Sequence, residues 1–230
     1  MKKFFLRAYL FEIGIFVVFV VLCLMFGRSQ VSSGSSADIQ KTIRNISPSV
    51  VMILDQGNVT GAGIVVDGVK WIILTSKHLF SRENGYMIRR EDGQNYAIEK
   101  IFPHPVHDLA LVQVTADNSL TQLAPIQIIA SWNTLERGDD VLSFWALALN
   151  QSMIVSRGIL SSTRQRMELR GREDFFLQTD VNAQTGFSGG PLFDRDGQLI
   201  GINTAVLGIN TSVSWSTPVT QKQVDEMMQF

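Results

Sequence analysis

From Pro48 onward the chain is a series of short β-rich runs separated by Gly, Asn and Asp, and no long helical pattern interrupts them. The runs of the first half are Val50–Leu54, Gly61–Val66, Trp71–Thr75, Tyr86–Arg89, Tyr96–Phe102 and Leu109–Val114. Those of the second half are Val141–Trp145, Met153–Ser162, Phe175–Gln178, Pro191–Phe193, Gln198–Asn203 and Ser212–Ser216. Strands without long helices between them predict a sandwich or a barrel. Their number favours an all-β domain of two six-stranded antiparallel β-barrels, at about 48–116 and 126–218.

Two short helices are expected at the ends of this domain. Asp38–Ile46 carries isoleucines at helical spacing and stops before Pro48, which disfavours a helical conformation in the residue ahead of it. At the other end, Thr220 and Gln223 form a capping-box pattern, which predicts a helix over residues 220–229.

An apolar stretch near the N-terminus predicts a membrane segment. Residues 8–26 contain a single charged residue, Glu12, and Lys2, Lys3 and Arg7 precede them. A stretch of this length can span a bilayer, and basic residues ahead of it keep the N-terminus in the cytoplasm. Because bulky and charged residues follow where a signal peptidase needs small ones, we expect residues 1–28 to form a retained signal anchor, a single transmembrane helix.

The rest of the chain has the composition of an ordinary globular domain that follows a short linker. Residues 29–37 form a Ser/Gly-rich linker, and the folded domain is expected to span residues 38–230. The first thirty residues carry a net charge of +3, which leaves −4 for the remainder of a chain whose total is −1. A mildly acidic domain without a basic run argues against nucleic acid as a partner.

One segment, TGFSGGPLFD from Thr185 to Asp194, carries a candidate nucleophile. It places Ser188 between Gly186 on one side and the two glycines Gly189 and Gly190 on the other. Glycine lets the backbone turn tightly and expose its N–H groups to an oxyanion. A Gly/Ser surface turn is the alternative for this pattern taken alone.

A serine nucleophile needs a base, usually a histidine oriented by a carboxylate. His78 follows the apolar run WIILTSK, and Asp108 opens the run DLALVQV, where a buried carboxylate would need a partner. His104 and His107 flank a proline-containing loop. Taken singly, each of these residues also suits a solvent-facing or turn position.

A metal site of His104, His107 and Asp108 fits on spacing, but zinc normally takes a defined ligand set and no cysteine is near. We therefore expect no metal and no cofactor.

The order of these residues adds a further indication. His78 and Asp108 lie in the first half of the domain and Ser188 in the second. A base and a nucleophile on different barrels predict an active site in the cleft between them.

These segments resemble the HtrA/Deg group of chymotrypsin-like serine proteases. The segments that carry the resemblance are TSKHLF, HDLALVQV, FLQTDVNAQ, TGFSGGPLFD, DGQLIGINT and SWSTP, within about Val50 to Pro218. The resemblance implies that His78 is the general base, Asp108 its orienting carboxylate and Ser188 the nucleophile. It also implies an oxyanion hole from backbone N–H groups of the Gly186, Phe187 and Ser188 loop, those of Gly186 and Ser188 in particular.

The sequence departs from that family in two places. Phe187 stands where HtrA members carry Asn and zymogen-activated relatives carry Asp, so activation by a freed N-terminus is not expected. How the oxyanion loop is held is left open. HtrA proteases usually continue into a PDZ module, and we expect none before Phe230. By its position six residues before the nucleophile, Asn182 is a tentative specificity residue, with a turn residue as the alternative.

The sequence thus predicts a membrane-tethered serine endopeptidase for protein quality control or regulated proteolysis in the bacterial envelope. It would be a single-pass inner-membrane protein, with its protease domain in the periplasm or outside the cell. Its partners would be unfolded or flexible polypeptides, and the resemblance also suggests a homotrimer. The alternative is a catalytically silent binding scaffold on the protease fold. An α/β-hydrolase is disfavoured because its triad order is Ser, acid, His and its strands alternate with helices.

Overall fold

The computed structural model describes residues 36–115, 123, 126–206 and 212–229. Both barrels belong to one compact unit, Ala37–Phe230. Within the described residues no helix has the length and apolar character needed to cross a bilayer. The expected anchor, residues 1–28, and most of the expected linker lie outside the described residues, so both stay predictions.

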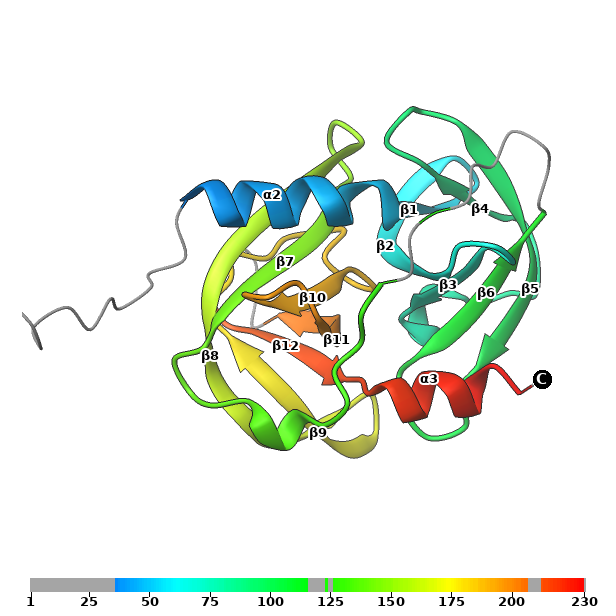
Figure 1. Cartoon of the computed structure of the whole chain (residues 1–230). Helices are drawn as coiled ribbons and strands as arrows, with labels where there is room; N and C mark the ends of the chain where they lie inside the picture. The colour runs from blue at the N-terminus through cyan, green and yellow to red at the C-terminus, as the bar shows by residue number, and fades with distance from the viewer. Residues whose placement is uncertain (1–35, 116–122, 124–125, 207–211, 230) are drawn as a thin grey trace, which may run out of the picture. The chain divides into compact units, whose positions relative to one another are not determined.

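The first barrel is closed and antiparallel, with the strand order β1-β2-β3-β6-β5-β4. Its strands are β1 (Val50–Asp55), β2 (Asn58–Asp67), β3 (Ile72–Thr75), β4 (Tyr86–Arg89), β5 (Asn95–Pro103) and β6 (Ala110–Val114). The second barrel is closed in the order β10-β11-β12-β9-β8-β7. Its strands are β7 (Asp140–Leu147), β8 (Ser152–Leu169), β9 (Arg172–Thr179), β10 (Pro191–Asp194), β11 (Leu199–Val206) and β12 (Ser214–Pro218). The all-β prediction of two six-stranded antiparallel barrels is confirmed, and Figure 1 shows them side by side.

Apolar side chains pack inside each barrel and between the two. Alternate residues of a strand face opposite sides, so Val51 and Ile53 of β1 fill the first barrel. The neighbouring Val50 instead joins a shared cluster that also contains Phe144 of β7 and Phe193 of β10. β1 is therefore buried on both faces, which explains its continuous apolar run.

The two terminal helices pack against this shared cluster. Helix α2 (Ser36–Ile46) inserts Ile46 into it, as the helical spacing of its isoleucines predicts. Helix α3 (Gln221–Met227) begins with the predicted capping box, in which the Thr220 N–H donates to Gln223 Oε1 at 2.9 Å. This helix is shorter than the expected 220–229.

The largest difference from the expected strands is the β8–β9 ribbon. Periodicity ended the eighth strand at Ser162, but β8 continues to Leu169 and β9 begins at Arg172. No residue of the extension is fully buried, so the apolar alternation that marks a strand fades there although the backbone pairing continues. Arg170 and Gly171, with φ of +53° and +75°, form the two-residue turn at the ribbon's tip.

Candidate active site

His78 and Asp108 form a hydrogen-bonded pair at the end of the first barrel. His78 lies in the 3₁₀ turn Lys77–Leu79 directly after β3, and Asp108 lies in the loop between β5 and β6. Asp108 Oδ2 is 2.7 Å from His78 Nδ1, and Asp108 Oδ1 accepts the backbone N–H of His78 at 2.9 Å. Because an ionised carboxylate only accepts, the Nδ1 atom carries the proton and Nε2 is left as the basic nitrogen.

The electrostatic environment keeps Asp108 ionised. Burial raises the pKa of Asp108, but the hydrogen bonds and charge of His78, together with the charge of Arg170, outweigh it and hold the pKa below its ordinary 3.8. Both side chains of the pair are 18% exposed, so the interaction is only partly screened by water. A carboxylate of this kind fixes the ring and stabilises the imidazolium that forms when His78 accepts a proton.

The loop that carries Ser188 packs directly against the His78 segment. The backbone carbonyl of Ser188 accepts the Ala62 N–H at 2.9 Å, so the second barrel's loop is bonded to the first barrel. The carbonyl of Asn203 accepts both the Gly189 N–H, at 2.8 Å, and the Ser76 hydroxyl, at 3.0 Å. One buried carbonyl thus joins the residue after Ser188 to the residue two before His78.

Within the described residues, no hydrogen bond joins the Ser188 hydroxyl to His78. The structure therefore brings His78 and Asp108 into direct contact and places the loop of Ser188 beside them. Hydrogen bonds between nucleophile and base are often long in enzymes without substrate and tighten when it binds.

The backbone of the Ser188 loop leaves two N–H groups unused. Gly186 has a φ of +97°, and a Cβ atom there would overlap the carbonyl oxygen of Ala146. No hydrogen bond among the described residues uses the N–H of Gly186 or of Ser188, which suits the expected oxyanion hole. Phe187 also belonged to the expected set, but its N–H donates to Gln184 O at 3.0 Å and is not available to an oxyanion.

The side chain of Phe187 explains what can hold this loop. It is 2% exposed and packs in the core of the second barrel with Trp145, Val181 and Leu192. An apolar anchor therefore stands where relatives are expected to carry a polar side chain. Its burial ties the two free N–H groups to the barrel core.

A second His–Asp pair lies close to the first. His107 Nδ1 is 2.6 Å from Asp174 Oδ2, on the β8–β9 ribbon. His104 Nδ1 accepts the N–H groups of Val106, at 3.0 Å, and His107, at 2.8 Å. The three residues of the conceivable metal set thus have different partners, and the described residues hold no cluster with metal-ligand spacing.

Acid is expected to loosen this loop through His104. Burial first, and then the charges of His107 and Lys77, lower the pKa of His104 below its ordinary 6.5. The folded state therefore binds fewer protons than the unfolded state, and the free energy of unfolding falls as the pH drops below about 6.5. Protonation at Nδ1 would also remove the acceptor of both N–H groups. We expect a His104→Asn variant, which keeps an acceptor oxygen, to lose a few degrees less in Tm between pH 7.5 and 5.5 than the wild type. Equal losses in thermal melts would contradict this account.

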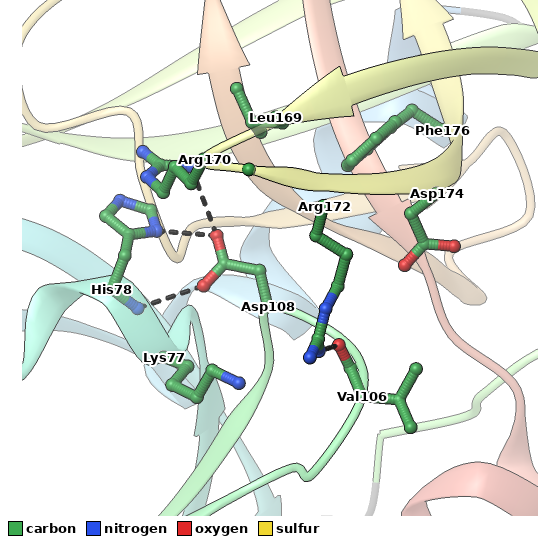
Figure 2. A pocket seen from close by; sticks show the side chains of 10 residues that line it. Lys77, His78, Val106, Asp108, Leu169, Arg170, Arg172, Asp174 and Phe176 are labelled. Carbon is green, nitrogen blue, oxygen red and sulfur yellow. Dashed lines mark hydrogen bonds and ion pairs between the residues drawn. The ribbon is translucent and has the colours of Figure 1, made fainter.

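The His78–Asp108 pair and the β8–β9 ribbon line one pocket of about 340 Å³. Figure 2 shows its walls, which consist of Lys77, His78, Val106, Asp108, Leu169, Arg170, Gly171, Arg172, Asp174 and Phe176. The sequence pattern does not predict the ribbon residues of this pocket, because it places the end of the eighth strand at Ser162 and β8 continues to Leu169. The Arg-Gly pair between charged, strand-like segments was the signal for a hairpin turn that would have found them.

Asn182 has a different position from the other expected site residues. It is exposed, its carbonyl accepts the Ser156 hydroxyl at 3.4 Å, and it is not part of the pocket beside His78. Its role in specificity stays a prediction.

Comparison with known proteins matches the sequence to a family. The profile of the trypsin-like peptidase domain matches residues 61–202, which include His78, Asp108 and Ser188. The chain is 34% identical over 149 residues to the periplasmic pH-dependent serine endoprotease DegQ of Escherichia coli K12, across 64% of this chain and 31% of DegQ. It is 29% identical over 163 residues to the periplasmic serine endoprotease DegP of the same organism, across 69% of this chain and 33% of DegP.

A solved structure of the HtrA-type protease AlgW with a tripeptide has the same fold, with a TM-score of 0.68 over 83% of this chain and 62% of AlgW. At 23% identity this likeness concerns the fold alone. The chain spans about a third of the length of DegQ and DegP. Because the family profile covers more than half of the sequence, the chain belongs to the family of trypsin-like peptidase domains.

Proposed function

We propose that this protein is a serine endopeptidase that hydrolyses peptide bonds with Ser188, His78 and Asp108. The observation that carries the proposal is the His78–Asp108 pair, in which the carboxylate accepts hydrogen bonds from the backbone N–H and the ring of His78. This pair lies beside a serine loop with two free N–H groups. DegQ and DegP are named serine endoproteases, which supports the same reaction here.

The proposed mechanism follows from the orientation of the His78 ring. His78 Nε2 takes the proton of the Ser188 hydroxyl as its oxygen attacks the peptide carbonyl, and Asp108 stabilises the imidazolium. The N–H groups of Gly186 and Ser188 receive the oxyanion of the tetrahedral intermediate. The imidazolium then returns the proton to the leaving amine, and water releases the acyl group by the same steps.

The cellular setting is proposed from the sequence and the relatives together. The apolar stretch at residues 8–26, with basic residues before it, supports a single-pass inner-membrane anchor with the protease domain outside the cytoplasm. The names of DegQ and DegP place those proteins in the periplasm. We propose flexible or unfolded polypeptides as substrates, in envelope quality control or regulated proteolysis, and a homotrimer as the assembly.

A fluorophosphonate probe tests the proposed activity. We expect the probe to label Ser188 in isolated membranes, and Ser188→Ala to lose labelling and about 10⁴- to 10⁶-fold of casein hydrolysis. A matched variant, Ser131→Ala, removes a serine hydroxyl outside the site and is expected to keep both. Labelling of another residue, or casein cleavage retained by Ser188→Ala, would refute the proposal.

The silent-scaffold alternative keeps one observation in its favour. Within the described residues the Ser188 hydroxyl is not bonded to His78, and Phe187 replaces a polar residue in the adjoining loop. A scaffold would remain folded, with a cooperative thermal melt, and would not react with the probe at any pH. An active protease reacts, so the same measurement separates the two.

A further inference from the structure

The tip of the β8–β9 ribbon reaches the catalytic carboxylate. Arg170 donates from Nη1 to Asp108 Oδ2 at 3.3 Å, and this is the oxygen that also bonds His78 Nδ1 at 2.7 Å. Figure 2 shows both interactions meeting at one oxygen atom. The mechanism above does not use Arg170, although it brings a positive charge to the residue that stabilises the imidazolium.

The ribbon holds this arginine in place through alternate residues. Arg172 and Asp174 are two positions apart on β9, so their side chains face the same side, and Arg170 of the turn lines the same pocket. Arg172 donates to the carbonyl oxygens of Pro105 and Val106, and Asp174 bonds His107 at 2.6 Å. All three residues therefore contact the loop that carries Asp108.

The backbone at the tip places Arg170 in an unusual conformation. Its φ of +53° lies in the left-handed region that a two-residue hairpin turn of this type requires. Asn, Asp and Gly are the residues favoured at that position, and a long side chain is disfavoured there. Gln56 adopts a similar φ of +49° before Gly57, so the fold tolerates such a residue. What distinguishes Arg170 is its partner.

The other charged groups of the site bind partners other than Asp108, and Arg170 differs from them in this respect. The titratable and charged groups that surround the pair are Lys77 from the 3₁₀ turn, His104 and His107 from the β5–β6 loop, and Arg170, Arg172 and Asp174 from the ribbon. The Lys77 ammonium donates to His104 O at 3.0 Å, Arg172 binds carbonyl oxygens, and Asp174 pairs with His107. Among the described residues, Arg170 is the Arg or Lys side chain that forms an ion pair with the Asp108 carboxylate.

We propose that Arg170 is a positioning residue that acts through Asp108: its guanidinium shares Oδ2 with His78 and thereby sets the pH at which the site becomes active. A cation on that oxygen withdraws part of the negative charge that would stabilise the imidazolium. The neutral, basic form of His78 then persists to lower pH. This inference rests on the proposed function, because His78 is taken as the general base.

The Arg170→Asn variant tests the charge without disturbing the turn, since Asn-Gly is a favoured pair in such hairpins. We expect the acidic limb of the fluorophosphonate labelling rate, measured against pH, to move up by about 0.3–0.8 pH unit. That size follows from unit charges several ångströms apart in a half-exposed site, where water screens much of the interaction. The shift should shrink in 0.5 M NaCl.

Two further variants separate charge from structure. Arg170→Lys keeps the charge, and the acidic limb of its labelling rate is expected to lie close to that of the wild type. Arg166→Gln removes a cation of the same ribbon that pairs with Glu173 rather than with Asp108, and is expected to leave the limb unmoved. If Arg170 only fastened the loop, Arg170→Asn would slow labelling equally at every pH. That result, or an equal shift in Arg166→Gln, would overturn the proposal.

A second readout is independent of catalysis. The midpoint of the His78 ring titration, followed by nitrogen-15 NMR, is expected to rise in Arg170→Asn by the same amount. If the wild type is never labelled, the proposed function fails, but the ring titration still decides whether Arg170 acts on His78. An unmoved ring midpoint would refute the role of Arg170 whatever the activity.

Discussion

Replacing Asp108 with asparagine is expected to lower kcat/KM by about 10⁴-fold while the barrels stay folded. The two contacts of the carboxylate explain the size of the effect. Oδ1 accepts the backbone N–H of His78 and Oδ2 accepts its ring proton. An amide can replace only one of these acceptors, because its nitrogen donates.

The backbone contact decides which way the amide would turn. The His78 N–H is fixed by the 3₁₀ turn, so the amide oxygen is expected to stay on it and the amide NH₂ to face Nδ1. Arg170 also faces that position, but its side chain is 45% exposed and can turn into water. The ring would then accept at Nδ1 and carry its proton on Nε2. In that tautomer His78 cannot take the proton of Ser188.

The chain offers a matched control in its second His–Asp pair. Asp174→Asn changes a carboxylate that lies 2.6 Å from a histidine Nδ1 in the same pocket, but is not bonded to His78. We expect it to lower kcat/KM by less than about tenfold, because it acts only on the loop position. Steady-state casein hydrolysis at pH 7.5 measures both variants. Similar losses in the two would mean that the first pair has no special role.

Thermal melts keep this comparison interpretable. The lowered pKa of Asp108 means that its ionised form stabilises the fold above about pH 3.8, and that this contribution disappears as the pH falls through the folded-state value. Asp108→Asn should therefore be somewhat less stable than the wild type at neutral pH and nearer to it in acid. A variant that is folded at pH 7.5 and inactive locates the defect in the chemistry.

Much of the fold could be predicted from sequence because buried strands leave a local signature. β1 and β4 were located within one residue, since apolar runs bounded by Gly, Asn or Asp mark them. The β8–β9 ribbon was not, because its outer half is stabilised by backbone pairing without a buried face. Its partner is a loop more than sixty residues away, as in the contact between Arg170 and Asp108. The local periodicity of a strand does not indicate which distant loop its exposed half will contact.

The candidate site also has a part that the sequence predicts and a part that it does not. His78, Asp108 and Ser188 stand in short motifs whose chemistry can be read directly, and the structure brings the first two into contact. The use of the Phe187 N–H could not be predicted, since it depends on how tightly the loop turns toward Gln184. The burial of the Phe187 side chain was equally hidden. A phenylalanine in a glycine-rich loop gives no sign of which core it enters.

Replacing Phe187 with alanine is expected to lower kcat by about 10²-fold or more at unchanged KM. The side chain is 2% exposed in the core of the second barrel, and the free N–H groups of Gly186 and Ser188 flank it. Without the ring, the loop has no apolar anchor and the two donors no longer hold a common direction. Oxyanion donors act in the transition state, so the loss falls on kcat rather than on substrate binding.

The loss of a buried ring also destabilises the protein, by about 3–5 kcal/mol, and this must be separated from the effect on the loop. Phe193→Ala is the matched control, since Phe193 stands five residues after Ser188 on β10 of the same barrel and is buried at 0% exposure in the cluster that the two barrels share. We expect a similar drop in Tm and, at a temperature where both variants are folded, a change in kcat of less than about threefold. Phe187→Leu and Phe193→Leu provide milder pairs if either alanine variant fails to fold.

The comparison also decides between two roles for the loop. If Phe187 served only the stability of the barrel, both alanine variants would show the same kcat per folded molecule. If it orients the oxyanion donors, Phe187→Ala alone should be slow, and Phe187→Leu should recover most of the rate because leucine still fills the pocket. Fluorophosphonate labelling would follow the same order, since the serine oxygen attacks the phosphorus and displaces fluoride while the phosphoryl oxygen accepts from the same N–H groups. The ring would then do by apolar burial what a polar residue is expected to do in relatives.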